Sequence, residues 1–160
     1  LVVAQPGRGV ISQAPLRLPA GVESDQADVR ANPAGDRVLL TLSTTINGTP
    51  LGALYTVRLD GSDLRAVTQP SQRLTRGGVR VSPTGAAWSP DGRWIAFLMR
   101  GVNPGVGGYM QGCGPVFFLP SDAQSQAIDN IEGSDRWTAT LPGSRKPLQA
   151  CHGVSLIWTR

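Results

Sequence analysis

The feature that most constrains the fold is an internal repeat. The stretch Ala31–Leu40 (Ala-Asn-Pro-Ala-Gly-Asp-Arg-Val-Leu-Leu) aligns without gaps with Trp88–Phe97 (Trp-Ser-Pro-Asp-Gly-Arg-Trp-Ile-Ala-Phe). Both contain a polar residue, a proline, a turn with glycine and then an apolar run. The start of a third unit, Leu156–Arg160, aligns with Ala86–Pro90. Repeats of this kind bury their apolar faces only against one another, so the chain is predicted to be an array of like units.

The apolar runs of the chain have the length of β-strands. The chain holds 20 Gly and 13 Pro among its 160 residues, and no window of eleven or more residues keeps a helical period without being cut by one of them. The continuous apolar run from Trp94 to Met99 indicates a strand that is covered on both faces. The sequence therefore predicts an all-β fold, with strands at Val38–Leu42, Leu54–Leu59, Leu64–Thr68, Trp94–Met99 and Val116–Leu119.

Turn residues stand between these strands. Pro90, Asp91 and Gly92 form one turn, because Pro fixes φ, Asp bonds the nearby backbone and Gly takes the left-handed corner. Asp60 and Gly61 form another, which joins the strands on either side into a hairpin.

Two further stretches are predicted to lie outside the strands. Asn47-Gly48-Thr49 is a glycosylation sequon, but Asn-Gly is also a standard turn, and the turn is favoured. The Gly-rich stretch Gly101–Gly114 is predicted to be a surface loop without regular structure, held in place by Cys113.

Two segments carry a pattern that is known from repeat proteins. Trp88–Phe97 reads aromatic-Ser-Pro-Asp-Gly-x-x-Ile-Ala-Phe, and Leu54–Thr68 reads Leu-Tyr-Thr-Val-Arg-Leu-Asp-Gly-Ser-Asp-Leu-Arg-Ala-Val-Thr. Together these segments resemble the two halves of a blade in TolB-type, WD-repeat-like β-propellers. The resemblance covers about residues 27–132, although Val116–Asp122 of the second unit lacks the Asp-Gly turn. It implies antiparallel four-stranded blades that pack face to face.

The resemblance divides the chain into about two blades and two partial blades. Residues 27–69 and 86–131 are the expected blades, joined by a linker at 70–85. Residues 1–26 form a preceding partial blade or an N-terminal segment, and 132–160 form a loop and the start of a following blade. Closed propellers use roughly 4–8 blades, so the remainder is expected in a longer parent chain, another copy or partner subunits. The expected blade core contains Tyr55, Trp88, Trp94, Phe97 and Trp158.

The two cysteines, Cys113 and Cys151, allow one intramolecular pairing. A disulfide is the preferred interpretation, and it favours a location outside the cytoplasm, in the periplasm or at the cell surface. The alternative is two buried thiols in a cytosolic protein. No apolar run approaches the roughly 18 residues of a transmembrane helix, so association with a membrane complex, if it occurs, is expected without a transmembrane segment.

The charge balance gives little support to nucleic-acid binding. Fifteen basic residues against 11 acidic residues give a net charge of +4. The arginines are scattered, and the densest group, Arg73, Arg76 and Arg80, has no interleaved aromatic residues on which bases could stack. We therefore expect protein partners rather than nucleic acid.

No motif of catalysis, cofactor binding or metal binding occurs in the sequence. Asp60 and Asp91 are interpreted as turn residues that bond backbone amides. His152 is the one histidine and stands beside Cys151, which is too small a ligand set for a tetrahedral metal site. The chain has no Gly-x-Ser-x-Gly elbow, no Ser-x-x-Lys pair and no phosphate-binding loop.

These observations lead to one functional hypothesis with two alternatives. The first is a non-catalytic, extracytoplasmic β-propeller interaction module, an accessory or assembly subunit. The alternative from a different class is part of the propeller domain of a larger hydrolase of the prolyl-oligopeptidase type, which TolB-like propellers resemble. A third reading is a small open array of blades that closes by homodimerisation.

Overall fold

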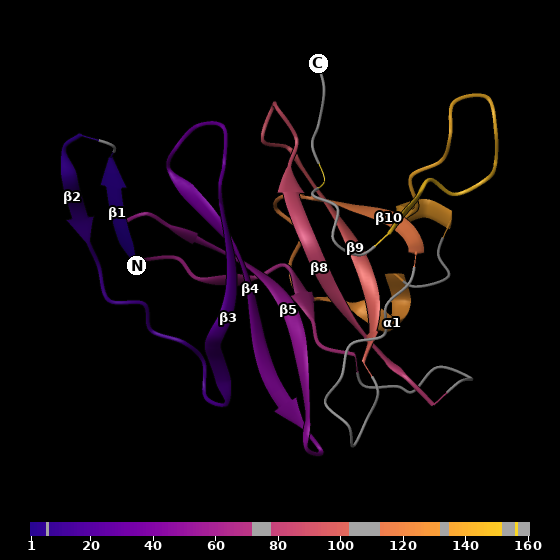
Figure 1. Ribbon diagram of the computed structural model, residues 1–160, viewed down its shortest axis with the longest axis horizontal. Helices are drawn as coiled ribbons and strands as arrows, with labels where there is room; N and C mark the ends of the chain where they lie inside the picture. Colours follow the sequence, from indigo (N-terminus) through magenta and orange to yellow (C-terminus); the bar gives the residue numbers. More distant parts are fainter. Residues whose placement is uncertain (6, 72–77, 103–112, 132–134, 152–155, 157–160) are drawn as a thin grey trace.

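The computed structural model describes residues 1–5, 7–71, 78–102, 113–131, 135–151 and 156 (Figure 1). Strands dominate these residues, which confirms the predicted all-β class. Two short helices accompany them, α1 (Ile128–Ile131) and the 3-10 helix η1 (Asp135–Trp137). The strands are β1 (Val2–Gln5), β2 (Gly9–Gln13), β3 (Val22–Ala31), β4 (Arg37–Ile46), β5 (Thr49–Arg58), β6 (Arg65–Ala66), β7 (Thr68–Gln69), β8 (Arg80–Trp88), β9 (Trp94–Val102), β10 (Cys113–Pro120), β11 (Gln126–Ala127) and β12 (Gln149–Cys151).

The first four-stranded sheet, here called sheet I, is an antiparallel meander in the order β3-β4-β5-β6. Strands β4 and β5 pair along their whole length and are joined by Asn47 and Gly48, whose φ angles are 50° and 73°. Two consecutive left-handed residues match the twist of a tight hairpin, so the predicted Asn-Gly turn is confirmed. The predicted hairpin around Asp60 and Gly61 is also present, because β5 pairs with β6.

The second sheet, sheet II, has the order β8-β9-β10-β12 and is also antiparallel throughout. Its first strand begins at Arg80, within the stretch 70–85 that was expected to be a linker. Pro83 and Gly85 are unfavourable in most strands, so the sequence did not predict this one. Strand β8 lies at the edge of the sheet, where a residue without an N–H is tolerated. The fourth strand, β12, lies beyond the expected second-blade boundary at residue 131.

The Gly-rich stretch 101–114 contributes residues to two strands, which the sequence did not predict. Gly101 and Val102 belong to β9, and Cys113 and Gly114 belong to β10. The prediction of irregular structure was therefore wrong at both ends of this stretch, and residues 103–112 lie outside the described residues. Glycine is accepted in these positions because cross-strand backbone pairing, and not side-chain packing, extends the strands there.

The two sheets pack face to face around a shared inter-sheet core (Figure 1). This core joins residues of sheet I with residues of sheet II and of α1, and its members are Leu39, Leu54, Val67, Ala86, Ile95, Phe97, Phe117, Leu119 and Ile131. The opposite face of sheet I, with Leu40 and Val57, is covered by the N-terminal segment through Leu1, Leu16 and Leu18. The opposite face of sheet II is a smaller cluster of Ala96, Leu98 and Val116.

Side-chain hydroxyls complete the junction between β5 and the segments beside it. The Gly52 amide donates to Ser82 Oγ at 2.7 Å, and the Leu54 amide donates to Thr68 Oγ1 at 2.9 Å, both in buried surroundings. A Cβ on Gly52 would lie 2.6 Å from Ser82 Oγ, so this close approach requires glycine. Because buried amides must be paired, the bond from Gly52 to Ser82 fixes where sheet II meets sheet I.

A short parallel pair adds a second connection between the sheets. Strand β11, which follows sheet II's third strand, pairs with β7, which follows sheet I's last strand. The amides of Ser125 and Gln126 donate to the carbonyls of Ala66 and Val67 at 2.9 Å. The N-terminal hairpin β1-β2 lies on the other side of sheet I from sheet II (Figure 1).

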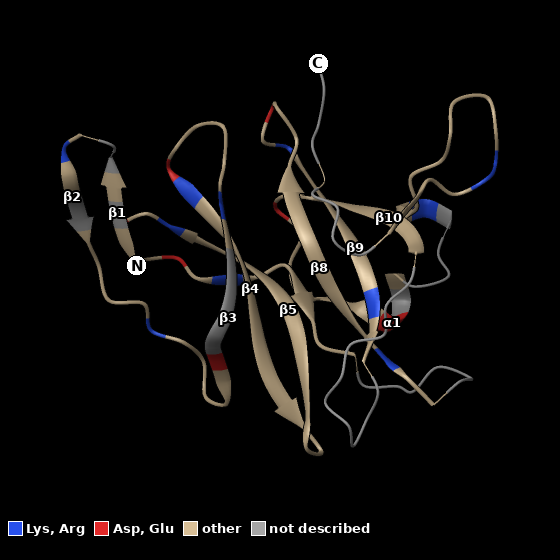
Figure 2. Ribbon diagram, viewed as in Figure 1, with Lys and Arg blue, Asp and Glu red and all other residues tan. Residues whose placement is uncertain are grey.

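Among the described residues, charged residues stand mostly at strand ends and in the connecting segments, and few stand in the middle of the sheets (Figure 2). The turn-bearing ends of the strands are therefore where polar chemistry can occur in this fold.

Candidate functional site: the corners of the two repeats

The turn that precedes β4 and the turn that precedes β9 have the same geometry. The Asn32 amide donates to the Arg37 carbonyl at 2.9 Å, and the Ser89 amide donates to the Trp94 carbonyl at 2.9 Å. The side chains act alike too, because Asn32 Oδ1 accepts from the Arg37 amide at 3.1 Å and Ser89 Oγ accepts from the Trp94 amide at 2.9 Å. In each turn, the side chain of the first residue thus accepts from the amide five residues later, and this side chain is Asn in one turn and Ser in the other.

A glycine at the same place completes both turns. Gly35 has φ 73° and its amide donates to the Asn32 carbonyl, while Gly92 has φ 70° and its amide donates to the Ser89 carbonyl. These φ values lie in the left-handed region, where a side chain is strained. The alignment that matches the two sequence segments therefore also matches these turns.

The strands around the turns share one register. Ala31 pairs with Val38 in sheet I, and the aligned residues of the second unit, Trp88 and Ile95, pair in sheet II. Both first strands also contain a register shift, between Glu23 and Asp28 in β3 and between Thr84 and Ala87 in β8. The sequence repeat is thus a repeat of backbone geometry.

A second corner follows the third strand of each sheet. The Leu59 amide donates to the Asp36 carbonyl at 3.1 Å, as the Ser121 amide donates to the Arg93 carbonyl at 2.8 Å. Leu59 and Ser121 lie further apart in the sequence than Asp36 and Arg93 do, because the connection between β9 and β10 is longer than the turn between β4 and β5. The two corners are therefore equivalent although a longer connection precedes the second one.

This second corner keeps its shape without the Asp-Gly pair. The Gly61 amide donates to the Arg58 carbonyl, and the Ala123 amide donates to the Pro120 carbonyl. Asp63 and Ser125, which follow these turns at the same distance, both have left-handed backbones with φ 53° and 49°. The second unit therefore keeps the first bond of the turn and the left-handed residue, but it lacks the bond from the Arg58 amide to the Ser62 carbonyl, because the equivalent residue, Pro120, has no N–H.

Gly61 has a reason of its own to be glycine. Its φ is 80°, and a Cβ there would lie 2.6 Å from the carbonyl oxygen of Pro15 in the N-terminal segment. Asp60 beside it accepts from the hydroxyl and the amide of Ser62 at 2.6 and 2.9 Å. These bonds, the hydroxyl first, hold the pKa of Asp60 below its ordinary value. The interpretation of Asp60 as a turn residue agrees with this geometry.

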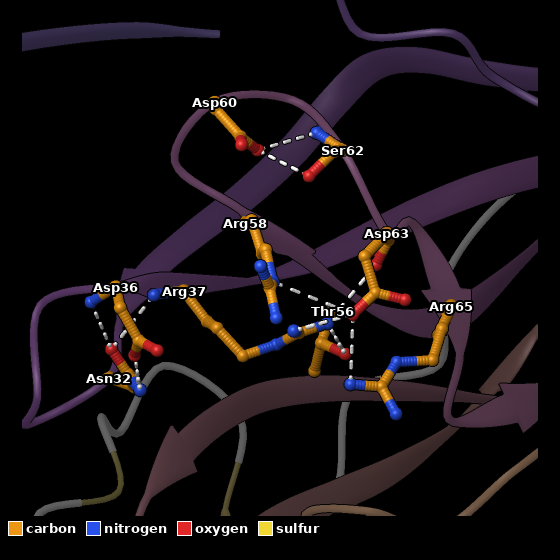
Figure 3. Close-up of polar contacts among 9 residues, drawn as sticks. All are labelled: Asn32, Asp36, Arg37, Thr56, Arg58, Asp60, Ser62, Asp63 and Arg65. Carbon is orange, nitrogen blue, oxygen red and sulfur yellow. Dashed lines mark hydrogen bonds and ion pairs between the residues drawn. The ribbon is translucent and has the colours of Figure 1, made fainter.

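In repeat one, which is the unit that forms sheet I, an ionic cluster surrounds Asp63 at this corner (Figure 3). Repeat two is the unit that forms sheet II. The Asp63 carboxylate lies 2.8 Å from Arg37 Nη1, 3.1 Å from Arg65 Nη2 and 3.9 Å from Arg58 Nε. The hydrogen bond from Arg37, aided by the other two guanidinium charges, holds the pKa of Asp63 below its ordinary value. We call Arg37, Arg58, Asp63 and Arg65 the ionic corner.

The ionic corner was not found from the sequence. Its members come from three strands and a turn, and nothing in a local pattern brings them together. Arg37 anchors it, because its side chain is 14% exposed and Nη2 also donates to the Asp63 carbonyl at 3.1 Å. A buried guanidinium needs such partners, so the cluster fixes the β5–β6 turn to the start of β4.

In repeat two, the equivalent positions carry no ionic cluster. They are Trp94, Pro120, Ser125 and Ala127, in place of Arg37, Arg58, Asp63 and Arg65. A hollow of about 370 Å³ lies here, lined by Arg93, Trp94, Ser121 and Asp122. The Trp94 indole meets Phe118 edge to face, with ring centroids 5.5 Å apart. We call Arg93, Trp94, Phe118, Ser121 and Asp122 the open corner.

Asp91 sits beside the open corner and is engaged in its own turn. Its carboxylate accepts from Ser89 Oγ at 2.6 Å and from Arg93 Nε at 2.7 Å. These bonds hold the pKa of Asp91 far below its ordinary value. With Pro90 at the first turn position and Gly92 left-handed, the predicted Pro-Asp-Gly turn is found as a turn.

The predicted core residues fall into two groups. Phe97 is fully buried and stacks on Phe117 with centroids 6.0 Å apart, and Tyr55 is buried on the far face of sheet I, where desolvation raises the pKa of its hydroxyl. Trp88 and Trp94 are only half-buried. Trp158 lies outside the described residues.

The two half-buried tryptophans have different environments. Trp88 ends β8 and its Nε1 donates to the Arg30 carbonyl of β3 at 3.1 Å, so it ties the two sheets together. Trp94 lies on the face of sheet II that points away from sheet I. Ala139, Ala150 and Leu156 pack against the Ala96, Leu98 and Val116 cluster on that face, whereas Trp94 is only half-buried, so the expected coverage of this strand on both faces is incomplete at its first residue.

Cys113 and Cys151 form a disulfide, as the sequence predicted. They are directly opposite each other in β10 and β12, and both are exposed. The bond therefore fastens the edge strand of sheet II. His152 lies outside the described residues, and the described part of the chain contains no group of three or more His, Cys, Asp or Glu residues that could hold a metal ion.

Within the described residues, no helix is long and apolar enough to cross a membrane. Comparison of the chain with family models, curated proteins and solved structures gives no match.

Proposed function

We propose that the chain is a non-catalytic β-propeller interaction module that works outside the cytoplasm as an accessory or assembly subunit. The observation that carries this proposal is that the same three-stranded antiparallel arrangement with its turns occurs twice, in β3-β4-β5 and in β8-β9-β10, and that the two sheets stack face to face. A module of this kind presents sheet faces and corners to other proteins, and the open corner is where this chain offers one.

The two sheets meet through non-equivalent faces, and such head-to-tail stacking supports the arrangement of blades in a propeller. Leu39 and Leu54 of sheet I point toward sheet II, but their counterparts in sheet II, Ala96 and Val116, lie on the face that points away from sheet I. The face of sheet II that meets sheet I is thus not equivalent to the face of sheet I that meets sheet II, and the equivalent of the latter face in sheet II points outward. Repetition of that relation about an axis gives the radial arrangement of blades in a propeller.

The start of the third unit in the sequence follows the same direction. Ala86 packs into the inter-sheet core against sheet I, and its aligned residue Leu156 packs against Ala96, Leu98 and Val116 on the outward face of sheet II. Leu156 therefore occupies the place in the second interface that Ala86 occupies in the first. This agreement supports a third unit that begins where the sequence predicts.

The state of the carboxylates supports a non-catalytic role. Asp60, Asp63 and Asp91 each bond a turn or an arginine, and these bonds lower their pKa values. A general acid or base near neutral pH needs a pKa close to that pH, and these carboxylates are shifted in the other direction. The exposed disulfide supports an oxidising location.

Photo-crosslinking in the cells that make the protein tests the proposal. p-Benzoyl-phenylalanine replaces Ser121 in the open corner, and the control carries it at Thr45, which is exposed in β4. A discrete protein adduct from position 121, absent from position 45 and found in the extracytoplasmic fraction, is expected. The absence of an adduct at position 121 would contradict the proposal. So would a cytoplasmic protein whose Cys113 and Cys151 are reduced. Turnover of a substrate by the purified chain, lost in the Asp91→Asn variant, would contradict the non-catalytic role.

A further inference from the structure

We infer that the hairpin at residues 139–148 is a processing site, at which a trypsin-like serine endopeptidase hydrolyses the bond between Arg145 and Lys146. The product is a two-chain form whose pieces are held together by the disulfide between Cys113 and Cys151. This inference goes beyond the proposed function and does not depend on it. We call the hairpin at 139–148 the arm.

The arm projects from the side of the molecule that carries sheet II (Figure 1). All residues from 140 to 149 are exposed, and this is the longest uninterrupted run of exposed residues in the described part of the chain. It includes Leu141 and Leu148, which are 43% and 39% exposed. None of these residues belongs to a hydrophobic cluster of the described chain. The arm is therefore not anchored by apolar packing.

Few hydrogen bonds hold the arm in its hairpin shape. The Leu141 amide donates to the Lys146 carbonyl at 3.1 Å, and the Leu148 amide donates to the Ala139 carbonyl at 2.7 Å. Pro147, between these two pairs, has no N–H to donate. Exposed backbone bonds without buried apolar contacts open at low cost, and a protease cleaves a chain in proportion to the population of its open form.

The turn of the arm carries the residue type that trypsin-like proteases recognise. Such a protease has an aspartate in the pocket that receives the side chain before the cleaved bond, and this pocket takes Arg or Lys. Arg145 and Lys146 are both exposed, and within the described residues neither makes an ion pair. The ring of Pro147 restricts the Lys146–Pro147 bond. The bond between Arg145 and Lys146 is therefore the one presented for cleavage.

Other arginines of the described chain are held more firmly. The ionic corner engages three of them with Asp63. Arg136 lies in η1 with its guanidinium 4.6 Å from the ring centroid of Trp137, which packs against the inter-sheet core. Arg17 stands between two leucines that pack on sheet I. Arg8 lies in the turn of the β1-β2 hairpin, whose strands pair directly on either side.

The proposed step is an ordinary hydrolysis that consumes one water. The serine oxygen of the protease forms a bond to the Arg145 carbonyl carbon, and the Lys146 nitrogen leaves with a proton from the protease histidine. Water then cleaves the acyl-enzyme. Arg145 ends in a carboxylate, and Lys146 begins the second piece with an ammonium group.

The place of the disulfide gives this cleavage a consequence. Cys113 precedes the cleaved bond and Cys151 follows it, so residues 1–145 and 146–160 stay linked after the cut. The second piece carries Ala150 and Leu156, which pack on the outward cluster of sheet II. In the uncut chain, reduction of the disulfide leaves these residues attached through the arm. In the cut chain, a thiol reductant releases them, so coverage of this face becomes dependent on the disulfide.

Limited digestion of the oxidised chain with trypsin tests the site. Without reductant, the first product is expected to be one species with the mass of the parent plus one water. After reduction, it is expected to separate into residues 1–145 and 146–160. Arg145→Gln is expected to prevent this cut. Arg8→Gln, a matched variant at another exposed arginine, should be cut at position 145 at the parent rate.

Two further measurements test the processing and its consequence. The chain recovered from the cells that make it is expected to separate into the same two pieces on reduction. Reduction should raise the fluorescence of anilinonaphthalene sulfonate, which binds exposed apolar surface, more in the cut chain than in the uncut chain. A first tryptic cut elsewhere, an Arg145→Gln chain that is cut as fast as the parent, a single intact chain from the cells or equal rises in fluorescence would overturn the inference.

Discussion

The ionic corner of repeat one and the open corner of repeat two share the backbone of the turns before β4 and β9, and they differ in the side chains at their equivalent positions. Where Arg37 and Arg65 meet Asp63 in the first, Trp94 stands beside a hollow in the second. Most backbone hydrogen bonds of the turns are nevertheless shared, and the bond from the Arg58 amide to the Ser62 carbonyl is the one that Pro120 cannot make. The comparison shows that a few amide bonds, and one left-handed glycine in the turn before β4 and before β9, are common to the two units, while the corner side chains differ.

The two faces of sheet II give the largest expected difference. Phe97→Ala is expected to lower the free energy of unfolding by about 3–5 kcal/mol, because the ring is fully buried between the sheets. Phe118→Ala, on the outward face, should lose less than half of that. Urea unfolding of both variants measures the difference. Equal losses would mean that the outward face is as well covered as the inter-sheet core and that the corner is not open.

Removal of the disulfide is expected to have the second-largest effect, and to affect sheet II more than sheet I. The double variant Cys113→Ser/Cys151→Ser is expected to lose about 3–4 kcal/mol, on the chain-entropy estimate for a separation of 38 residues. Because the bond fastens only β12 to β10, amide exchange should rise there before it rises in β4 and β5. Unchanged stability, or a uniform rise in exchange over both sheets, would contradict this account.

The equivalence of the turns is tested by matched glycine variants. Gly35→Ala and Gly92→Ala each place a side chain at φ near +70°, which costs about 1–2 kcal/mol. Neither position meets a neighbour closer than 3.8 Å, so strain of the backbone is the main cost in both. Thermal unfolding should give similar losses for the two variants. A large loss at one and none at the other would show that the two turns are not equivalent.

Acidification gives the smallest effect, and it acts on both corners. The pKa values of Asp63 and Asp91 are lowered in the folded state, by Arg37 and by Ser89 first. A lowered pKa stabilises the fold above the unfolded value and this stability is lost as pH falls, so unfolding should become easier below about pH 4. Asp63→Asn and Asp91→Asn should each flatten this acid limb. Both carboxylates are exposed, so added salt should weaken the effect.

Local patterns in the sequence predicted the parts of the fold that local chemistry determines. The paired repeat, the turns at Gly61 and Gly92 and the burial of Phe97 follow from residues that are neighbours in the chain. The Cys113–Cys151 bond was predicted because two cysteines allow only one pairing. The propeller order and the function stay predictions.

The features that were missed depend on contacts between distant segments. Strand β8 was hidden by Pro83, which only an edge position explains, and β12 joins its sheet across a long separation in sequence. The ionic corner brings Arg37 to Asp63 from a different strand, and Ser82 reaches Gly52 from the other sheet. No local periodicity records such pairings, so they could be read only from the structure.

The central claim is that the two units stack in one direction, and an experimental structure of the oxidised chain tests it most directly. We expect Ala31 to pair with Val38 and Trp88 with Ile95, with Leu39 and Leu54 facing Phe97 across the inter-sheet core. We also expect Ala96 and Val116 to face away from sheet I. Sheets that meet through Ala96 and Val116, or a sheet II whose register does not repeat that of sheet I, would contradict the account.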